Sequence, residues 1–336
     1  MVLRFGAALL LALVLLPGWA SAGSIVGVSV TGAVHADRRA YLQQLVFGSR
    51  ISTAWLPTST AADQASVWSG ETADLKWTVA MPESATSYCW FHSTSSSAPE
   101  LTIIHQGHDV WDDGVGFAEL AAAIELAGSD LLLLEMPGMG ANTWSLGHGP
   151  PTTAGHNQVS TLVGPTGFPA ALYPFLYPVA ACLNQAISNR SGDPYAQIGC
   201  TGLSGGGGTC TLLAALDSRI DISVDNSGSL PWSLRTTHYG DYEWSTTLWN
   251  IAPYEELYVM SADAAGRARC DHKNQNDSCC FARTGAKGAY GADFGDQIAK
   301  WDAEAAGSIT WTEANDPGFH RIGVALRAAT LSCLGL

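Results

Sequence analysis

The chain has few charged residues, and basic residues are especially scarce. Charged side chains make up 14% of its 336 residues, and 16 Lys and Arg stand against 30 Asp and Glu, a formal net charge of −14 at pH 7. An acidic surface repels nucleic acid and anionic membranes, so neither is an expected partner. Apolar residues make up 47% of the chain, which indicates a globular protein rather than a disordered acidic one.

Beyond its first segment the sequence also lacks a long apolar run. Arg4 precedes an apolar stretch from Ala7 to Leu16, and Ala20-Ser21-Ala22 has the small residues of a signal cleavage site. The stretch is too short to span a membrane comfortably. We therefore expect residues 1–22 to be a secretory signal. The remainder is expected to be a secreted, extracellular or periplasmic protein without integral membrane association.

The cysteines point to disulfides rather than to a metal. Eight are present, at positions 89, 182, 200, 210, 270, 279, 280 and 333. An even number in an exported chain favours disulfides, although the sequence does not reveal their pairing. Cys270, Cys279 and Cys280 are close enough for a local staple, and their spacing matches no tetrahedral zinc pattern. No metal or other cofactor is expected.

The order of the apolar segments predicts the fold class. Residues 75–79 and 87–91 alternate as a hairpin would, and after them buried strands alternate with helical segments. This rhythm predicts an α/β fold with a mostly parallel sheet and helices on both faces. Strands are expected at residues 101–104, 131–134, 196–200, 220–224, 257–260 and 308–312, and helices at 38–47, 117–124, 177–187, 212–216 and 321–331.

Some segments do not follow this rhythm. Residues 138–172 and 229–256 are rich in Gly, Pro, Trp and His, and we expect cap-like insertions there, over the carboxyl ends of the strands where such sheets bind ligands. Residues 23–74 form an N-terminal extension in this prediction, with a loop-like stretch at residues 52–71. The α/β domain is then expected to span residues 75–336.

The motif Gly202-Leu203-Ser204-Gly205-Gly206 matches G-x-S-x-G and lies between a predicted strand and a helical run. Strand, tight turn and helix are the context in which this motif forms a nucleophile elbow. The serine of such a turn has a strained backbone, and small neighbours allow the turn to close. Ser204 is therefore the predicted nucleophile.

A serine hydroxyl needs a base to take its proton, and the base needs an acid to orient it. His320 follows the last predicted strand, at the edge where all parallel strands have their carboxyl ends, and is the predicted base. Asp263 and Asp277 compete as the acid. Asp263 directly follows the apolar segment at 257–262, whereas Asp277 leaves room for one helix and one strand before His320. We favour Asp277 and keep Asp263 as the alternative.

Acyl transfer also needs N–H donors aimed at the oxyanion. The backbone N–H of Gly205, next to the nucleophile, is one predicted donor. The other is the N–H of His108, in the loop after the predicted strand at residues 101–104, where Gly107 permits close approach of the backbone.

These residues together resemble the α/β-hydrolase superfamily. The resemblance rests on His105-Gln106-Gly107-His108, the segment Glu135–Gly140, Gly202–Gly206, a later acid and His320, in the order serine, acid, histidine. It covers residues 75–336. The segment Asn274–Phe281 is similar to one in secreted members of the superfamily, which also favours Asp277. Membership implies hydrolysis of an ester, thioester or amide without naming the substrate.

The sequence thus predicts a secreted serine esterase, carboxylesterase- or lipase-like, that cleaves a small-molecule or polymer ester through an acyl-enzyme. A serine peptidase or an acyltransferase on the same fold stays open, because insertions select the leaving group and the acceptor. A non-catalytic binding protein that kept the fold is the third alternative. Neither the oligomeric state nor the acyl chain length is predicted.

Overall fold

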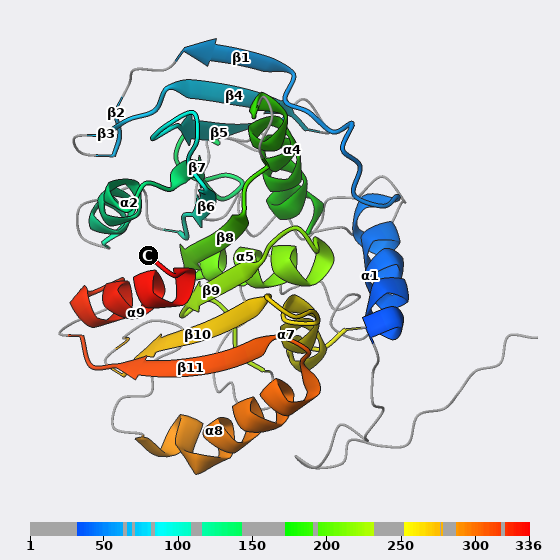
Figure 1. Cartoon of the computed structure of the whole chain (residues 1–336), viewed down its shortest axis with the longest axis vertical. Helices are drawn as coiled ribbons and strands as arrows, with labels where there is room; N and C mark the ends of the chain where they lie inside the picture. Colours follow the sequence, from blue (N-terminus) through cyan, green and yellow to red (C-terminus); the bar gives the residue numbers. More distant parts are fainter. Residues whose placement is uncertain are drawn as a thin grey trace, which may run out of the picture.

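The computed structural model describes residues 32–62, 66–68, 71–81, 85–108, 116–142, 172–190, 194–231, 252–275, 277, 287–316 and 320–336. Within these ranges a nine-stranded sheet has the order β1-β4-β5-β7-β6-β8-β9-β10-β11 (Figure 1). Its strands are β1 (Ser59–Ala62), β4 (Leu75–Ala80), β5 (Thr86–His92), β6 (Glu100–His105), β7 (Asp130–Leu134), β8 (Gln197–Leu203), β9 (Ile222–Asn226), β10 (Ala268–Asn274) and β11 (Ser308–Ala314). A separate pair consists of β2 (Ser66–Trp68) and β3 (Glu71–Thr72).

The sheet is mostly parallel, as predicted. Strands β7, β6, β8, β9, β10 and β11 run in one direction. Strands β1, β4 and β5 are antiparallel to their neighbours, and β4 with β5 is the predicted hairpin. The carboxyl ends of β6, β8, β9, β10 and β11 therefore lie at one edge, which is where the predicted site residues follow their strands.

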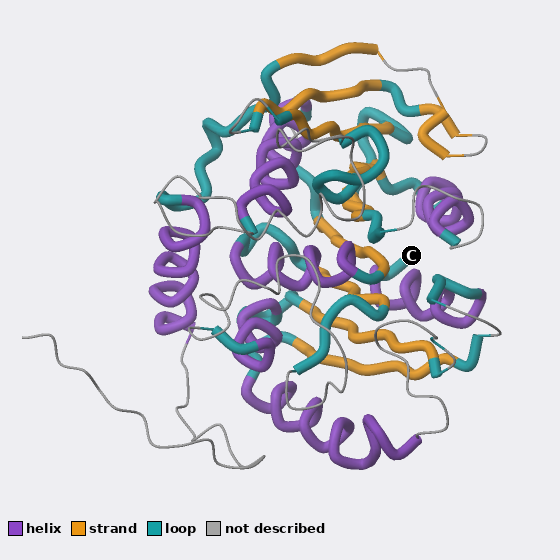
Figure 2. Tube along the Cα trace, turned by 180° about the vertical axis from the view of Figure 1, so that it is seen from behind, coloured by secondary structure: helices purple, strands orange, loops and turns teal. Residues whose placement is uncertain are grey.

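Helices cover both faces of the sheet (Figures 1 and 2). Strand β7 shows why: Leu131 and Leu133 belong to one apolar cluster, and Leu132 and Leu134 to the other, so a continuous apolar strand needs a cover on each side. The first cluster is covered by α2 (Phe117–Leu126) and α9 (Val324–Leu334). The second is covered by α1 (Gly32–Phe47), α4 (Tyr173–Asn189), α5 (Gly205–Leu216), α7 (Tyr254–Ser261) and α8 (Lys287–Glu304).

One predicted strand is a helix. Residues 257–260 belong to α7, and the strand at this place in the sheet is β10, which the sequence did not indicate. A short apolar run fits a buried helix as well as a buried strand. β10 was missed because Arg269, Asp271 and Lys273 alternate along it, yet all three are fully buried. Helix α8 was not predicted either, and the loop-like stretch at residues 52–71 contains the short strands β1 and β2 and the start of β3.

Several predictions fall outside the described residues. These are the signal at residues 1–22, most of the two insertions, at 143–171 and 232–251, and Cys279 and Cys280. They stay predictions, as does the boundary between the N-terminal extension and the α/β domain. In the described ranges no helix has both the length and the apolar character needed to cross a membrane.

Three disulfides join elements of the described structure. Cys89–Cys182 links β5 to α4, Cys200–Cys210 links β8 to α5, and Cys270–Cys333 links β10 to α9. The expected local staple is therefore wrong for Cys270, which pairs with a residue near the carboxyl terminus. The pairing follows from the fold, because α9 lies on the face of β10 that carries Cys270.

Loss of the Cys270–Cys333 bridge is expected to destabilise the protein. The bridge spans a sequence separation of 63 residues, and closing a loop of that length in the unfolded chain stabilises the folded state by about 4 kcal/mol. The double variant Cys270→Ser/Cys333→Ser should lose a stability of this order in urea unfolding. A midpoint equal to that of the wild type would contradict the bridge.

Two buried histidines should make the fold sensitive to acid. Burial lowers the pKa of His105 to about 4, and burial together with Lys273 lowers the pKa of His272 to about 4. Between pH 6.5 and about 4 each of these histidines is protonated in the unfolded chain but neutral in the folded one, so the free energy of unfolding should fall by about 1.4 kcal/mol per pH unit for each histidine. Urea midpoints measured downward from pH 6.5 should show this slope, and His272→Asn should reduce it. An unchanged slope in the variant would contradict the assignment.

Candidate active site

Ser204 lies in the sharp turn between β8 and α5. It is the N-cap residue of α5, with φ 58° and ψ −131°, and its residue surface is 6% exposed. Among the described residues, Ser204 and Ser227 are the non-glycine residues with a positive φ. Residues with a side chain rarely adopt this backbone conformation, which costs about 1–3 kcal/mol. The surrounding structure therefore has to impose it on Ser204.

The surrounding structure imposes it through glycines. A Cβ on Gly206 would lie 2.0 Å from the carbonyl oxygen of His105, and one on Gly202 would lie 2.4 Å from the same oxygen. A Cβ on Gly107 would lie 3.0 Å from Cβ of Ser204, and one on Gly228 would lie 2.3 Å from the carbonyl oxygen of Ser204. The end of β6 and the loops after β6 and β9 therefore contact the elbow through backbone.

The two predicted oxyanion donors are next to this contact in the chain. Gly205 is the first residue of α5, and its N–H belongs to the partly positive amino end of the helix. His108 follows Gly107, the residue that contacts Ser204. The N–H of Gln106 donates to Leu134 O at 2.9 Å and is not available to a substrate in this conformation.

His320 and Asp277 form a close pair. Nδ1 of His320 lies 2.7 Å from Oδ2 of Asp277, and the side chains are 11% and 1% exposed. Asp277 follows the carboxyl end of β10 and His320 follows that of β11, at the edge where Ser204 follows β8. The second ring nitrogen of His320, Nε2, is buried and has no hydrogen-bond partner among the described residues. A buried nitrogen of this kind is suited to exchange a proton with a group that enters the site.

The alternative acid, Asp263, has different partners. Its carboxylate lies 2.7 Å from Arg39 and 2.5 Å from Arg267, and both guanidinium groups also bind the carbonyl of Met260 in the last turn of α7. α5 starts at the elbow and runs back along the sheet, and its last-turn carbonyls also accept from these arginines. The structure thus brings Asp277 to His320 and places Asp263 at the far end of α5.

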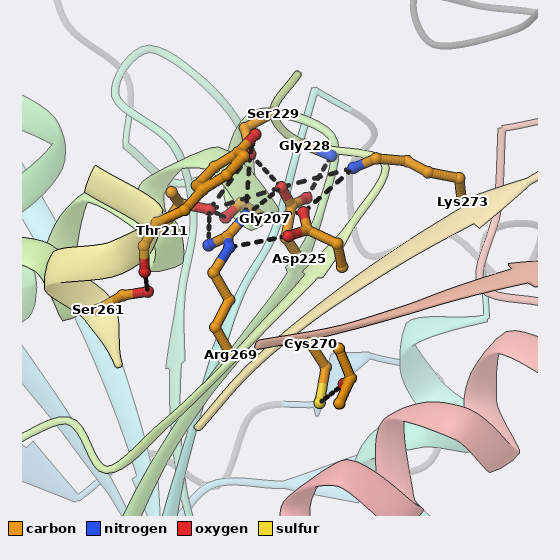
Figure 3. Close-up of polar contacts among 12 residues, drawn as sticks. Gly207, Thr211, Asp225, Gly228, Ser229, Ser261, Arg269, Cys270 and Lys273 are labelled. Carbon is orange, nitrogen blue, oxygen red and sulfur yellow. Dashed lines mark hydrogen bonds and ion pairs between the residues drawn. The ribbon is translucent and has the colours of Figure 1, made fainter. Parts of the chain in front are cut away.

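A buried charged cluster surrounds Asp225 (Figure 3). Asp225, at the end of β9, accepts hydrogen bonds from the N–H of Gly228 at 2.5 Å and from the hydroxyl of Ser229. Arg269 and Lys273 lie 3.3 and 3.5 Å from the same carboxylate. The pKa of Asp225 lies below its usual value. Burial alone would raise this pKa, but the two cations and these hydrogen bonds stabilise the carboxylate by more than burial disfavours it.

This cluster holds the loop after β9 against Ser204. Asn226 O accepts the N–H of Ser204 at 2.9 Å, while Gly228 contacts the serine carbonyl. Arg269 also binds Asp271 through two hydrogen bonds of 2.9 and 2.7 Å. The sequence analysis did not predict this cluster. The sequence does show charged residues at alternate positions, Arg269, Asp271 and Lys273, which is the pattern by which the strand could have been recognised. In the described ranges no three His, Cys, Asp or Glu side chains gather to hold a metal ion.

Comparisons by sequence find no relatives: no protein-family model and no curated protein matches the chain. Among solved structures it is similar to Methylesterase BT1017, at 14% identity and a TM-score of 0.58 over 90% of this chain and 63% of that chain. The chain thus spans less than two thirds of that methylesterase.

Two further solved structures match this chain over more of their own length than the methylesterase does. Acetyl xylan esterase 1 from Thermoanaerobacterium sp. JW/SL YS485 shows 14% identity and a TM-score of 0.54 over 89% of this chain and 92% of that chain. The acetyl xylan esterase from Paenibacillus sp. R4 shows 12% identity and a TM-score of 0.51 over 92% and 95%. At such identities the likeness is one of fold. The chain has the α/β-hydrolase fold that its sequence predicted.

Proposed function

We propose that this protein is an exported serine hydrolase that cleaves an ester through a covalent acyl-enzyme. The observation that carries the proposal is the buried His320–Asp277 pair. In this pair Nε2 of His320 has no hydrogen-bond partner among the described residues. The pair follows strands that end at the same edge of the sheet as the strained turn of Ser204. The choice of an ester is supported by the solved structures of similar fold, which are named as esterases.

In the proposed reaction, Nε2 of His320 takes the proton of the Ser204 hydroxyl as its oxygen attacks the acyl carbonyl. Asp277 accepts the Nδ1–H hydrogen bond, fixes the tautomer and stabilises the imidazolium that forms. The N–H groups of Gly205 and His108 bind the oxyanion of the tetrahedral intermediate. His320 then protonates the leaving alcohol, and a water molecule activated by the same histidine releases the acid.

Export belongs to the same proposal. The segment at residues 1–22 has the pattern of a secretory signal. The three disulfides of the described structure are of a kind that persists in an oxidising compartment.

Replacement of Ser204 should abolish the activity without loss of stability. Wild type should react with a fluorophosphonate and hydrolyse p-nitrophenyl acetate, whereas Ser204→Ala should not be labelled and should lose roughly 10⁶-fold in kcat. Ser204→Gly should be equally inactive but more stable, because glycine adopts φ 58° without strain. Ser227→Ala is the matched control, since Ser227 also has a positive φ and is buried. Labelling that persists in Ser204→Ala would refute the proposal.

The two aspartates should separate activity from stability. Asp277→Asn should lower kcat by about 10⁴-fold, because the amide no longer holds the histidine in its working tautomer. Asp263→Asn should leave kcat near wild type and reduce the free energy of unfolding by on the order of 3 kcal/mol, because Arg39 and Arg267 lose their carboxylate. Steady-state kinetics with urea unfolding tests both variants, and the opposite pattern would transfer the acid role to Asp263.

A further inference from the structure

The loop that carries His320 is closed on itself by one carboxylate. The loop leaves β11 at Ala314 and enters α9 after Gly323. Asp316, near its start, is 3% exposed. Its Oδ1 accepts the N–H of Ala325 and its Oδ2 accepts the N–H of Leu326, each at 2.9 Å. One side chain before His320 thus binds backbone groups after it.

The carboxylate occupies the place of a helix cap. Gly323 is the N-cap residue of α9 and has no side chain to satisfy the first N–H groups of the helix. A Cβ on Gly323 would lie 2.4 Å from Cγ of Asp316. A serine or aspartate at the N-cap would normally make these bonds locally. Here the cap comes from across the loop, so it also joins the two ends of the loop.

Two other contacts involve His320 and Ile322, which come between these ends in the chain. Ile322 is 1% exposed, and its carbonyl oxygen would lie 2.1 Å from a Cβ on Gly116, just before α2. His320 is held by Asp277 at 2.7 Å. The pair with Asp277 lets the ring tilt about one hydrogen bond, so the direction of Nε2 depends on the backbone on either side.

We propose that Asp316 is a positioning residue for His320: it ties the two ends of the loop so that the imidazole presents Nε2 toward Ser204. This inference rests on the proposed function. Asp316 acts through the backbone, because its carboxylate accepts the N–H groups of Ala325 and Leu326. Its loss leaves the His320–Asp277 pair possible but widens the range of ring orientations. A misplacement of about 1 Å costs roughly a hundredfold in rate.

The test distinguishes two effects of the Asp316 carboxylate: it links the two ends of the loop, and it caps the amino end of α9. Asp316→Ala removes both effects. In Asp316→Ala/Gly323→Ser, the new hydroxyl caps α9 from its own N-cap position, where the extended backbone of Gly323 (φ −75°, ψ −174°) accepts a side chain. The Cβ that alanine keeps at position 316 would lie 2.6 Å from the serine Cβ, so the start of the loop, freed of its two hydrogen bonds, has to move back to admit the serine. The double variant should recover the helix cap, and with it thermal stability, while the two ends of the loop stay unlinked.

Asp130→Asn provides the matched control for stability. Asp130 is also buried, and it accepts the Thr94 N–H at 2.8 Å and the Tyr195 hydroxyl at 2.8 Å. It lies at the start of β7, at the opposite edge of the sheet from the candidate active site. This variant should lose stability and keep its kcat.

The measurements are kcat, KM and the rate of fluorophosphonate labelling, at a temperature where all variants are folded. We expect kcat and labelling to fall roughly a hundredfold in Asp316→Ala and to stay low in the double variant, with KM little changed. Recovery of kcat together with stability would reduce Asp316 to a helix cap and overturn the inference, as would a kcat of Asp316→Ala equal to that of Asp130→Asn. Wild type that is not labelled at Ser204 would instead overturn the proposed function, and the inference with it.

Discussion

The structure depends on one constraint, the strained backbone of Ser204. A serine at φ 58° and ψ −131° persists because the chain around it leaves no relaxed alternative. Glycines let the end of β6, the start of α5 and the loop after β9 approach the turn within distances that no side chain tolerates. The same contacts bring Gly107, and with it the loop that carries His108, against the serine. The glycines that let the backbone segments approach Ser204 thus also hold the serine in its strained conformation.

Strand β10 connects this constraint to the rest of the site. On one face Arg269 and Lys273 hold Asp225, which fixes the loop that contacts Ser204. On the other face Cys270 is bonded to Cys333 of α9, the helix that follows the loop of His320. Beyond its carboxyl end the strand leads to Asp277. A buried charged strand is costly unless its groups are paired. Here the pairs of Arg269 and Lys273 with Asp225 join β10 to the end of β9, next to the loop that contacts Ser204.

Local patterns in the sequence sufficed for much of this fold. Strand, turn and helix around Gly202–Gly206 gave the elbow, and continuous apolar segments gave β6 and β7, because their neighbours in the chain determine them. The strand β10 was not predicted, since its charges are buried only because distant residues pair with them. The partners of Cys270, Asp225 and Asp316 likewise depend on the folded chain. The contact between Asp277 and His320 agrees with the spacing argument, which left room for α8 and β11 between them.

The most direct test of the central claim is an experimental structure of the protein after reaction with a phosphonate ester. The account predicts a covalent bond from phosphorus to Oγ of Ser204. It also predicts a phosphonyl oxygen about 2.7–3.2 Å from the N–H of Gly205, and Nε2 of His320 within hydrogen-bond distance of an oxygen of the adduct. An adduct on another residue, or an imidazole turned away from Ser204 while the adduct is in place, would contradict it.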